Sequence, residues 1–302
     1  MTENQHNKNN KNLQDLRNEI DEIDHEIINL INRRMSIIPK VSEIKKNNNE
    51  KFFIKSSREA DMIKNLVKKV ENNSLKLAVI NIWRKIITNA NNCEQKLKIG
   101  IHNPLSLVEY EYLVREFFSQ EISITNFDSA TNLIAEIEKS TINIGVFLLP
   151  KFENEFDKKD TTQKNWWINM SNNRVGLKIY AKIPFFEFTS KINDHKKNDH
   201  LQLVLSAIKE AEPSGSDNTI LSIEVSNSVS KSEIFSLFTN NNFNLKLLSC
   251  VKNSQFIGIS LYLVEIDGFF TENDFRIKQL SQDKIKPFIK VLGNYPLPII
   301  LD

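Results

Sequence analysis

The chain has 302 residues, of which 40% are hydrophobic and 26% charged, and its formal net charge is +2 at pH 7. This composition is that of a globular protein with one large or two to three small domains, and it lacks the basic block with interleaved aromatics that indicates a nucleic-acid-binding protein. No apolar run approaches the roughly 20 residues of a membrane helix, the N-terminus has no apolar signal core, and two distant cysteines make neither a zinc site nor a disulfide framework, so a cytoplasmic protein without metal is expected.

Residues 1–12 are polar and rich in asparagine, a composition that predicts a disordered lead-in. Residues 13–95 carry helical periodicity and almost no strand signal. The first predicted helix covers residues 16–46, where apolar residues recur at steps of three and four in LRNEIDEIDHEIINLINRRMSIIPKVSEIKK. Helices without a sheet cannot close a large core alone, so we expect a dimer built from long helices.

Two further helices are predicted in this part of the chain. The second begins near Ser56, which has the spacing of a capping box with Glu59. The third covers residues 75–95 and has an apolar face at helical spacing. The residues of that face are Val79, Trp83, Ile86 and Ala90.

The pattern changes after residue 95. Short β-rich runs alternate with helical segments over residues 96–215, which predicts a small parallel α/β lobe ending in the linker AEPSGSDN. Residues 216–302 follow the order strand, helix, strand, strand, helix, strand, which is the ferredoxin-like βαββαβ unit. In the lobe, Trp166 and Trp167 are interpreted as core residues rather than as a binding surface.

Cations fall on the apolar stripe of the first helix. Arg34 and Lys45 are eleven residues apart, which is about 16 Å along one helix face, so their side chains can converge on one small anion. Arg17 is about 25 Å from Arg34 along the helix and reaches a similar site only with a second, antiparallel chain. A buried cation without a partner costs several kcal/mol, so these cations are expected to be paired or to hold a ligand.

Three more charged residues extend this candidate site. Arg58 and Glu59 open the second helix, where the backbone N–H groups favour an anion, and Glu94 follows Ala90 on the stripe of the third helix. A cationic site with few acceptors, and without a Ser–His pair, a metal cluster or a Gly-rich phosphate loop, suits a small dicarboxylate. The structural alternative is that each arginine is a paired surface residue and that Glu94, near a helix end, faces water.

The stretches LRNEIDEIDHEIINLINRR, READ and IWRKI, together with Lys45, resemble the all-helical class of chorismate mutase over residues 13–95. The resemblance implies an intertwined homodimer in which Arg17 enters the partner chain's site and binds the carboxylates of chorismate with Arg34 and Lys45. It also implies that Lys45 approaches the breaking ether bond, that Glu59 binds the ring hydroxyl, and that Arg58 supports the site.

The implied reaction, the pericyclic conversion of chorismate to prephenate, needs no cofactor. An enzyme supplies a compact substrate conformer and cations where negative charge grows on the ether oxygen. At Glu94, bacterial relatives usually carry glutamine, which donates a hydrogen bond to that oxygen. Because a carboxyl group donates only when protonated, a mildly acidic optimum is expected, with Gln95 as the donor if the register differs by one.

The rest of the chain resembles a shortened prephenate dehydratase with an ACT-like domain, most clearly in EPSGSDNTILSIEV and FIKVLGNYPLP. The Thr-Arg-Phe triplet of that family corresponds here to His200, Leu201 and Gln202, and the Gly-rich opening of the family is replaced by IHNPLS. Dehydratase activity is therefore expected to be lost. Feedback by phenylalanine is not expected either, because the ligand-binding signatures of the ACT-like part are also replaced.

These observations predict a multidomain fold: an all-α chorismate mutase helical domain of three helices in an intertwined dimer, then a small α/β lobe, then a ferredoxin-like ACT-type domain. The expected activity is that of a chorismate mutase, an isomerase of the shikimate pathway in aromatic amino acid biosynthesis. Two alternatives remain, a non-catalytic regulatory or dimerisation protein, and an isochorismate pyruvate lyase of the same helical fold.

Overall fold

The computed structural model describes residues 2–48, 52, 54–152, 164–172, 175–189, 201–210, 212–252 and 258–301, with side chains from residue 12 onward. Its N-terminal part is helical, as predicted, and consists of α1 (Thr2–Asn47), α2 (Ser56–Val67) and α3 (Asn73–Glu94). Because α1 begins at Thr2, it takes in most of the segment predicted to be a disordered lead-in. The side chains of residues 1–11 lie outside the description, so this prediction stays a prediction.

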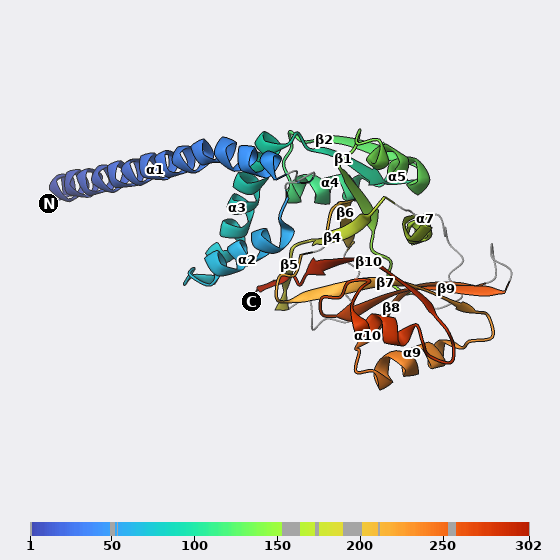
Figure 1. The fold of residues 1–302 in the computed structure, drawn as a ribbon. Helices are drawn as coiled ribbons and strands as arrows, with labels where there is room; N and C mark the ends of the chain where they lie inside the picture. Colours follow the sequence, from blue (N-terminus) through green and yellow to red (C-terminus); the bar gives the residue numbers. More distant parts are fainter. Residues whose placement is uncertain are drawn as a thin grey trace.

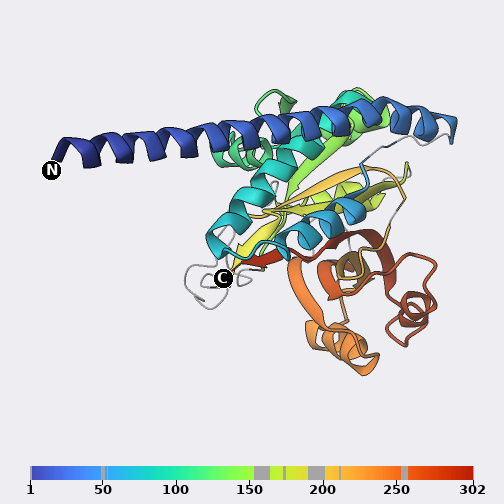
Figure 2. The ribbon, with the colours of Figure 1, turned by 90° about the vertical axis from the view of Figure 1, so that its left-hand side faces the viewer.

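The long helix α1 is only half covered. Its C-terminal half packs against α3, whereas its N-terminal half stands clear of the rest of the molecule in both ribbon views (Figures 1 and 2). Its apolar stripe is consequently open to solvent in the single chain. The exposed members are Leu13, Leu16, Ile20, Ile23, Ile27, Ile28, Leu30, Ile37 and Ile44.

The helices α2 and α3 pack against each other and against the C-terminal part of the chain. The most buried face of α3 includes Ile80, Arg84 and Ile87, one step along from the predicted face of Val79 and Trp83, which are half-buried. The reason is that α3 is covered from two sides, by α2 and by residues that follow in the sequence. The hydrophobic periodicity of α3 alone does not show that residues later in the sequence cover a second side of the helix.

The predicted capping box at the start of α2 is absent. Ser56 is the first helical residue, and the N-cap residue Lys55 makes no side-chain cap. The carboxylate of Glu59 turns away from its own helix start because it accepts hydrogen bonds from two residues of α3.

One nine-stranded sheet, in the order β2-β1-β3-β6-β4-β10-β7-β9-β8, runs through the rest of the molecule. The lobe supplies β1 (Lys98–His102), α4 (Val108–Phe117), β2 (Ser123–Phe127), α5 (Ala130–Glu138), β3 (Ile144–Leu148), α7 (Trp166–Asn172), β4 (Leu177–Ile183) and β6 (Leu203–Ile208). The three strands β2, β1 and β3 are parallel, as expected, whereas β6 is antiparallel to both of its neighbours. The lobe is thus mixed, because β6 lies between β3 and β4 and is antiparallel to both.

The tryptophans of the lobe are core residues, as predicted. Trp166 and Trp167 are fully buried in a cluster with α5 and with strands of both halves of the sheet. The Trp166 ring stacks on Phe147, and its indole N–H donates to the carbonyl of Leu148 at 2.6 Å.

The C-terminal unit has the predicted βαββαβ order. Its elements are β7 (Asp217–Ser226), α9 (Lys231–Asn240), β8 (Leu245–Lys252), β9 (Ile259–Asp267), α10 (Phe275–Leu280) and β10 (Phe288–Pro296). The strands are antiparallel in the order β10-β7-β9-β8, and both helices lie on one face (Figure 1). This confirms the ferredoxin-like unit.

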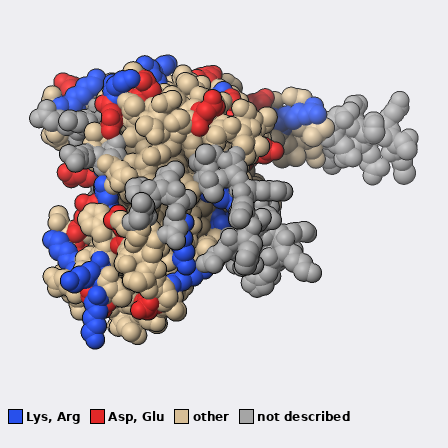
Figure 3. Space-filling model, turned by 90° about the vertical axis from the view of Figure 1, so that its right-hand side faces the viewer, with Lys and Arg blue, Asp and Glu red and all other residues tan. Residues whose placement is uncertain are grey.

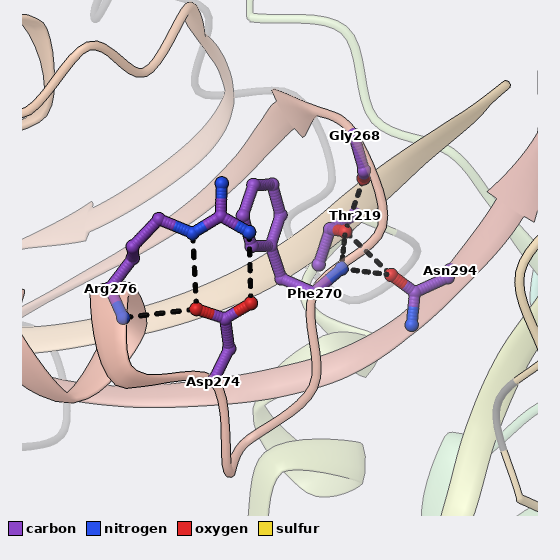
Figure 4. A network of polar contacts seen from close by, with 6 residues as sticks. All are labelled: Thr219, Gly268, Phe270, Asp274, Arg276 and Asn294. Atoms are coloured by element: carbon purple, nitrogen blue, oxygen red, sulfur yellow. Dashed lines mark hydrogen bonds and ion pairs between the residues drawn. The ribbon is translucent and has the colours of Figure 1, made fainter. Parts of the chain in front are cut away.

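A polar network fastens the segment between β9 and α10 to the sheet (Figure 4). The backbone N–H of Phe270 donates to Thr219 Oγ1 at 3.1 Å and to Asn294 Oδ1 at 3.3 Å. Asp274 caps α10 by accepting from the backbone N–H of Arg276 at 2.9 Å, and the two side chains form an ion pair. Neighbouring strands therefore hold the turn before α10.

Two pairings return the end of the chain to the rest of the molecule. Strand β10 pairs with β4 at Gly293 and Ile179, which joins the lobe and the C-terminal unit in one sheet. A short strand β11 (Ile299–Leu301) then pairs with β5 (Phe186–Phe188). Ile299 and Leu301 are buried in a cluster with α2 and α3, so the C-terminus covers the helices.

Side chains of both charge signs are spread over the face in Figure 3. Among the helices in the described part of the chain, none is long and apolar enough to cross a membrane. The described residues contain no group of three or more His, Cys, Asp or Glu side chains that could hold a metal ion.

Candidate active site

The apolar stripe of α1 ends on an ion pair. Lys45, two residues before the end of α1, donates to Glu94, the last residue of α3, with 2.5 Å between Nζ and Oε2. Only 14% of the lysine side chain and 5% of the glutamate side chain are exposed. The inward orientation expected for Glu94 is therefore present, and Gln95 is the C-cap residue, with an extended backbone. The pair satisfies both charges, which alone would be costly to bury.

A second buried ion pair lies at the start of α2. Glu59 Oε2 accepts from Arg84 Nη1 at 2.9 Å, and Glu59 Oε1 accepts from Asn91 Nδ2 at 2.8 Å. The side chains of Arg84 and Glu59 are 6% and 13% exposed. Both oxygens of the carboxylate are thus held by donors seven residues apart on one face of α3.

Arg84 is a residue that sequence reasoning missed. Its guanidinium carbon lies 3.8 Å from the ring centre of Phe117 and 5.9 Å from that of Phe185. The signal was available, because a cation at position 84 falls between Ile80 and Ile87 at helical spacing, as Arg34 and Lys45 do on α1. Arg84 is left out of the candidate site because the neighbouring face, with Val79 and Trp83, is predicted to be the buried one.

A small cavity of about 20 Å³ adjoins this pair, and its lining includes Glu59, Arg84 and Tyr180. Within the described residues, the Tyr180 hydroxyl and Arg84 Nε have no hydrogen-bond partner. Burial, and next the charge of Glu59, raise the pKa of Tyr180 well above its usual value, so this phenol is a neutral donor. The cavity has room for one water molecule.

The remaining predicted residues lie apart from these two pairs. Arg34 is half-buried, and its Nη1 atom is buried without a partner among the described residues, so one guanidinium donor is available to a ligand. Arg58 is exposed at the start of α2. Arg17 is exposed on the projecting half of α1, at a distance from Lys45 that no side chain of the same chain can bridge.

A wider hollow of about 350 Å³ lies beside the ion pair of α1 and α3. None of the six predicted site residues lines it. Its lining consists of Ile38, Pro39, Ser42, Glu43, Lys46, Asn47 and Cys93.

Two stretches are expected, from the resemblance, to stand where a dehydratase has its motifs. In the first, His102 ends β1, and burial lowers the pKa of His102 to about 4. Of the counterpart of Thr-Arg-Phe, His200 lies outside the described residues, Leu201 is half-buried, and Gln202 Nε2 donates to Glu187 at 3.4 Å.

A search of curated proteins finds no significant match to the chain. Among solved structures, prephenate dehydratase from Streptococcus mutans aligns with a TM-score of 0.44 and 11% identity, over 66% of this chain and 97% of that one. Prephenate dehydratase from Arthrobacter aurescens in complex with L-Phe aligns with a TM-score of 0.47 and 12% identity, over 68% and 93%. GqqA, described as a novel type of quorum quenching acylase, aligns with a TM-score of 0.44 and 12% identity, over 67% and 95%.

The family comparison bears on the helical part, where both buried ion pairs contain a residue expected to act in the site. Residues 16–95 match the family model of chorismate mutase type II, which confirms the resemblance expected for this part of the chain.

Proposed function

We propose that this chain is a chorismate mutase that converts chorismate to prephenate in aromatic amino acid biosynthesis. The observation that carries the proposal is the match of residues 16–95 to chorismate mutase type II. The site chemistry agrees with it, because that stretch contains an unpartnered buried donor on Arg34 and a buried cation at Lys45. A scaffold alone has no need of cations on a stripe that otherwise buries apolar groups.

In the proposed mechanism, Arg34 and Lys45 bind the carboxylates of chorismate. Lys45 has three N–H donors, so it can keep Glu94 as a partner while it donates to the substrate. Negative charge that develops on the ether oxygen is then stabilised by a cation already in place. Holding both carboxylates also selects the compact conformer in which the carbon–carbon bond forms as the carbon–oxygen bond breaks.

Three further residues complete the proposed site within one chain. Glu59 accepts the hydrogen bond of the ring hydroxyl, since a carboxylate has about four acceptor positions and the two bonds from α3 leave acceptor capacity. Arg58, on the first turn of the same helix, supports the site electrostatically. Glu94 donates to the ether oxygen only when it is protonated, a state that replaces its ion pair with Lys45, and this step connects the rate to acid pH.

We propose further that the enzyme is a homodimer in which Arg17 binds substrate in the partner's site. The apolar residues exposed along α1 support this, because a stripe of that length on a projecting helix is typical of an interface. A second α1 running antiparallel buries the stripe and brings Arg17 toward Arg34 and Lys45 of the other chain.

Loss of dehydratase activity is also part of the proposal. It is supported by the replacement of the Thr-Arg-Phe triplet, in which the arginine position is Leu201 and the third position is Gln202, an amide bonded to Glu187. A leucine does not supply the cation that the triplet's arginine provides.

The test is the loss of chorismate absorbance with the purified full-length chain from pH 5 to 9, with the products identified. We expect prephenate, no phenylpyruvate, and a loss of about 10- to 100-fold in kcat/KM for Arg34→Ala, the value of a charge-assisted hydrogen bond. Arg33→Ala is the matched control, since Arg33 is the exposed neighbour on the same helix.

Each alternative has its own outcome in this assay. Release of pyruvate from isochorismate, with no turnover of chorismate, indicates the lyase. No turnover of either substrate indicates the regulatory or dimerisation protein.

A further inference from the structure

We propose that Arg84 is a positioning residue of the mutase site: it fixes the carboxylate of Glu59, and two aromatic rings of the C-terminal region fix Arg84 in turn. The inference rests on the proposed function, because it assigns Glu59 to the substrate hydroxyl. It gives the region after residue 95 a role in the mutase reaction that does not require dehydratase chemistry.

The first step is the contact between Arg84 and Glu59. Arg84 Nη1 reaches Glu59 Oε2 at 2.9 Å, and Asn91 Nδ2 reaches Glu59 Oε1 at 2.8 Å. The carboxylate is held at both oxygens, which fixes the rotation of its plane and the direction of its remaining lone pairs. A hydroxyl that binds there meets an acceptor already oriented, so little ordering cost is left for the binding step.

The second step is the contact between Arg84 and the lobe. Phe117 is the last residue of α4, and Phe185 follows β4, so both rings come from beyond the match to chorismate mutase type II. The guanidinium lies 3.8 Å from the ring centre of Phe117, close enough for a strong cation–π contact in a buried setting. The rings prevent Arg84 from adopting the extended rotamers of a surface arginine.

The third observation is the chemistry of the surrounding cavity. Tyr180 contributes a buried hydroxyl without a partner in the described structure, next to the unpartnered Arg84 Nε. One water molecule in this space would join the phenol of β4 to the pair formed by Arg84 and Glu59. The lobe thus surrounds the pair with two rings and one neutral donor, and none of these lobe residues is among those proposed to bind substrate.

The neighbouring residue Lys85 provides a matched control. Lys85 Nζ donates to the carbonyls of Arg115, Glu116 and Phe118 at 2.9, 2.6 and 3.2 Å, so it also binds α3 to the lobe. These acceptors are all at the C-terminal end of α4, and none is a proposed site residue. Removing Lys85 therefore weakens the same interface without disturbing Glu59.

The experiment is steady-state chorismate kinetics on the full-length chain, combined with a double-mutant cycle. The variants are Arg84→Met, Arg84→Lys, Lys85→Met and Phe185→Leu, each also combined with Glu59→Gln. We expect Arg84→Met to lower kcat/KM by about 10-fold or more, mainly through KM, and Arg84→Lys to recover part of the loss. Lys85→Met should change kcat/KM by less than about twofold, because both hydrogen bonds to the Glu59 carboxylate stay in place.

The cycle separates positioning from general stability. If Arg84 acts through Glu59, Arg84→Met has no further effect in the Glu59→Gln background, and Phe185→Leu follows the same rule. Additive effects would overturn the inference, and so would equal losses for Arg84→Met and Lys85→Met.

The remaining outcomes are also decisive. Should Arg84→Met fail to fold, Phe185→Leu takes over the test, and unchanged kinetics of that variant count against the proposal. A wild-type chain that leaves chorismate unchanged refutes the proposed function, and the inference with it. A wild-type chain that makes prephenate while Arg84→Met remains fully active refutes the inference alone.

Discussion

Replacing Gly293 by alanine perturbs the joint between the lobe and the C-terminal unit. Gly293 lies in β10 with φ at +147° and pairs with Ile179 of β4. A Cβ atom at this position would lie 2.2 Å from the carbonyl oxygen of Ile179, 2.4 Å from its nitrogen and 2.8 Å from its carbonyl carbon. These are backbone atoms of a central strand, so no side-chain rotation relieves the overlap.

Two costs add for this substitution. A backbone conformation at this φ, which is almost confined to glycine, costs about 1–3 kcal/mol for alanine. Moving the two strands apart to make room for the methyl group costs about 1–3 kcal/mol more, by comparison with overpacked cores. The sum of about 2–6 kcal/mol corresponds to a fall in Tm of about 3–10 °C for a chain of this length.

Thermal unfolding followed by circular dichroism measures the effect. Gly215→Ala is the matched control, because Gly215 also has a positive φ of +79°, whereas its added Cβ would meet nothing within 4 Å. That variant carries only the backbone cost of about 1–2 kcal/mol. We expect the fall in Tm for Gly293→Ala to be at least twice that of the control. Equal falls would refute the argument that close approach of β4 requires glycine.

Three more predictions concern pH and assembly. Burial lowers the pKa of His102 to about 4, against 6.5 in the unfolded chain. Between these two values the unfolded state binds a proton that the folded state does not, so the free energy of unfolding falls as the pH falls. Urea unfolding should show a loss of about 2 kcal/mol from pH 7 to pH 5, and this loss should be missing in His102→Asn. Glu94→Gln supplies a donor at every pH, so its kcat should be flat from pH 5 to 9 where the wild type rises toward acid; a flat wild-type profile would exclude Glu94 as the donor. Ile23→Asp on the exposed stripe of α1 should give a monomer by analytical ultracentrifugation and should have no mutase activity. Val108→Asp, at an apolar site on α4 that is even more exposed (78% against 49%), should leave the dimer intact. Equal masses for the two variants would contradict the interface.

Much of the fold follows from periodicity in the sequence. Steps of three and four residues predict the helices of the N-terminal part, and the alternation of strands and helices predicts the βαββαβ order of the C-terminal unit. The inward position of Glu94 also follows from its place on a helical stripe. All of these are local properties of one element, and the period of the side chains determines them.

The other features of the fold and the site depend on which elements pack against each other, and the periodicity of one element does not predict that. The antiparallel pairing of β6 with β3 has no local signature, and neither does the joint at Gly293. The capping box predicted at Ser56 and Glu59 fails for the same reason, because the carboxylate finds Arg84 and Asn91 on another helix. Local hydrogen bonds give way when a buried charge offers a stronger partner.

The parts of the chain before and after residue 95 share buried cores. Ile54, from the segment before α2, is buried in the core of the lobe with β1 and α4. In the other direction, Ile299 and Leu301 at the end of the chain are buried against Ile63 and Ile87 of the helices. Three helices cannot close a core by themselves, and here the lobe and β11 supply the missing cover. The C-terminal region therefore packs the helices that carry the proposed site, and a chain cut after residue 95 would expose the face of α2 and α3 that Arg84 shares.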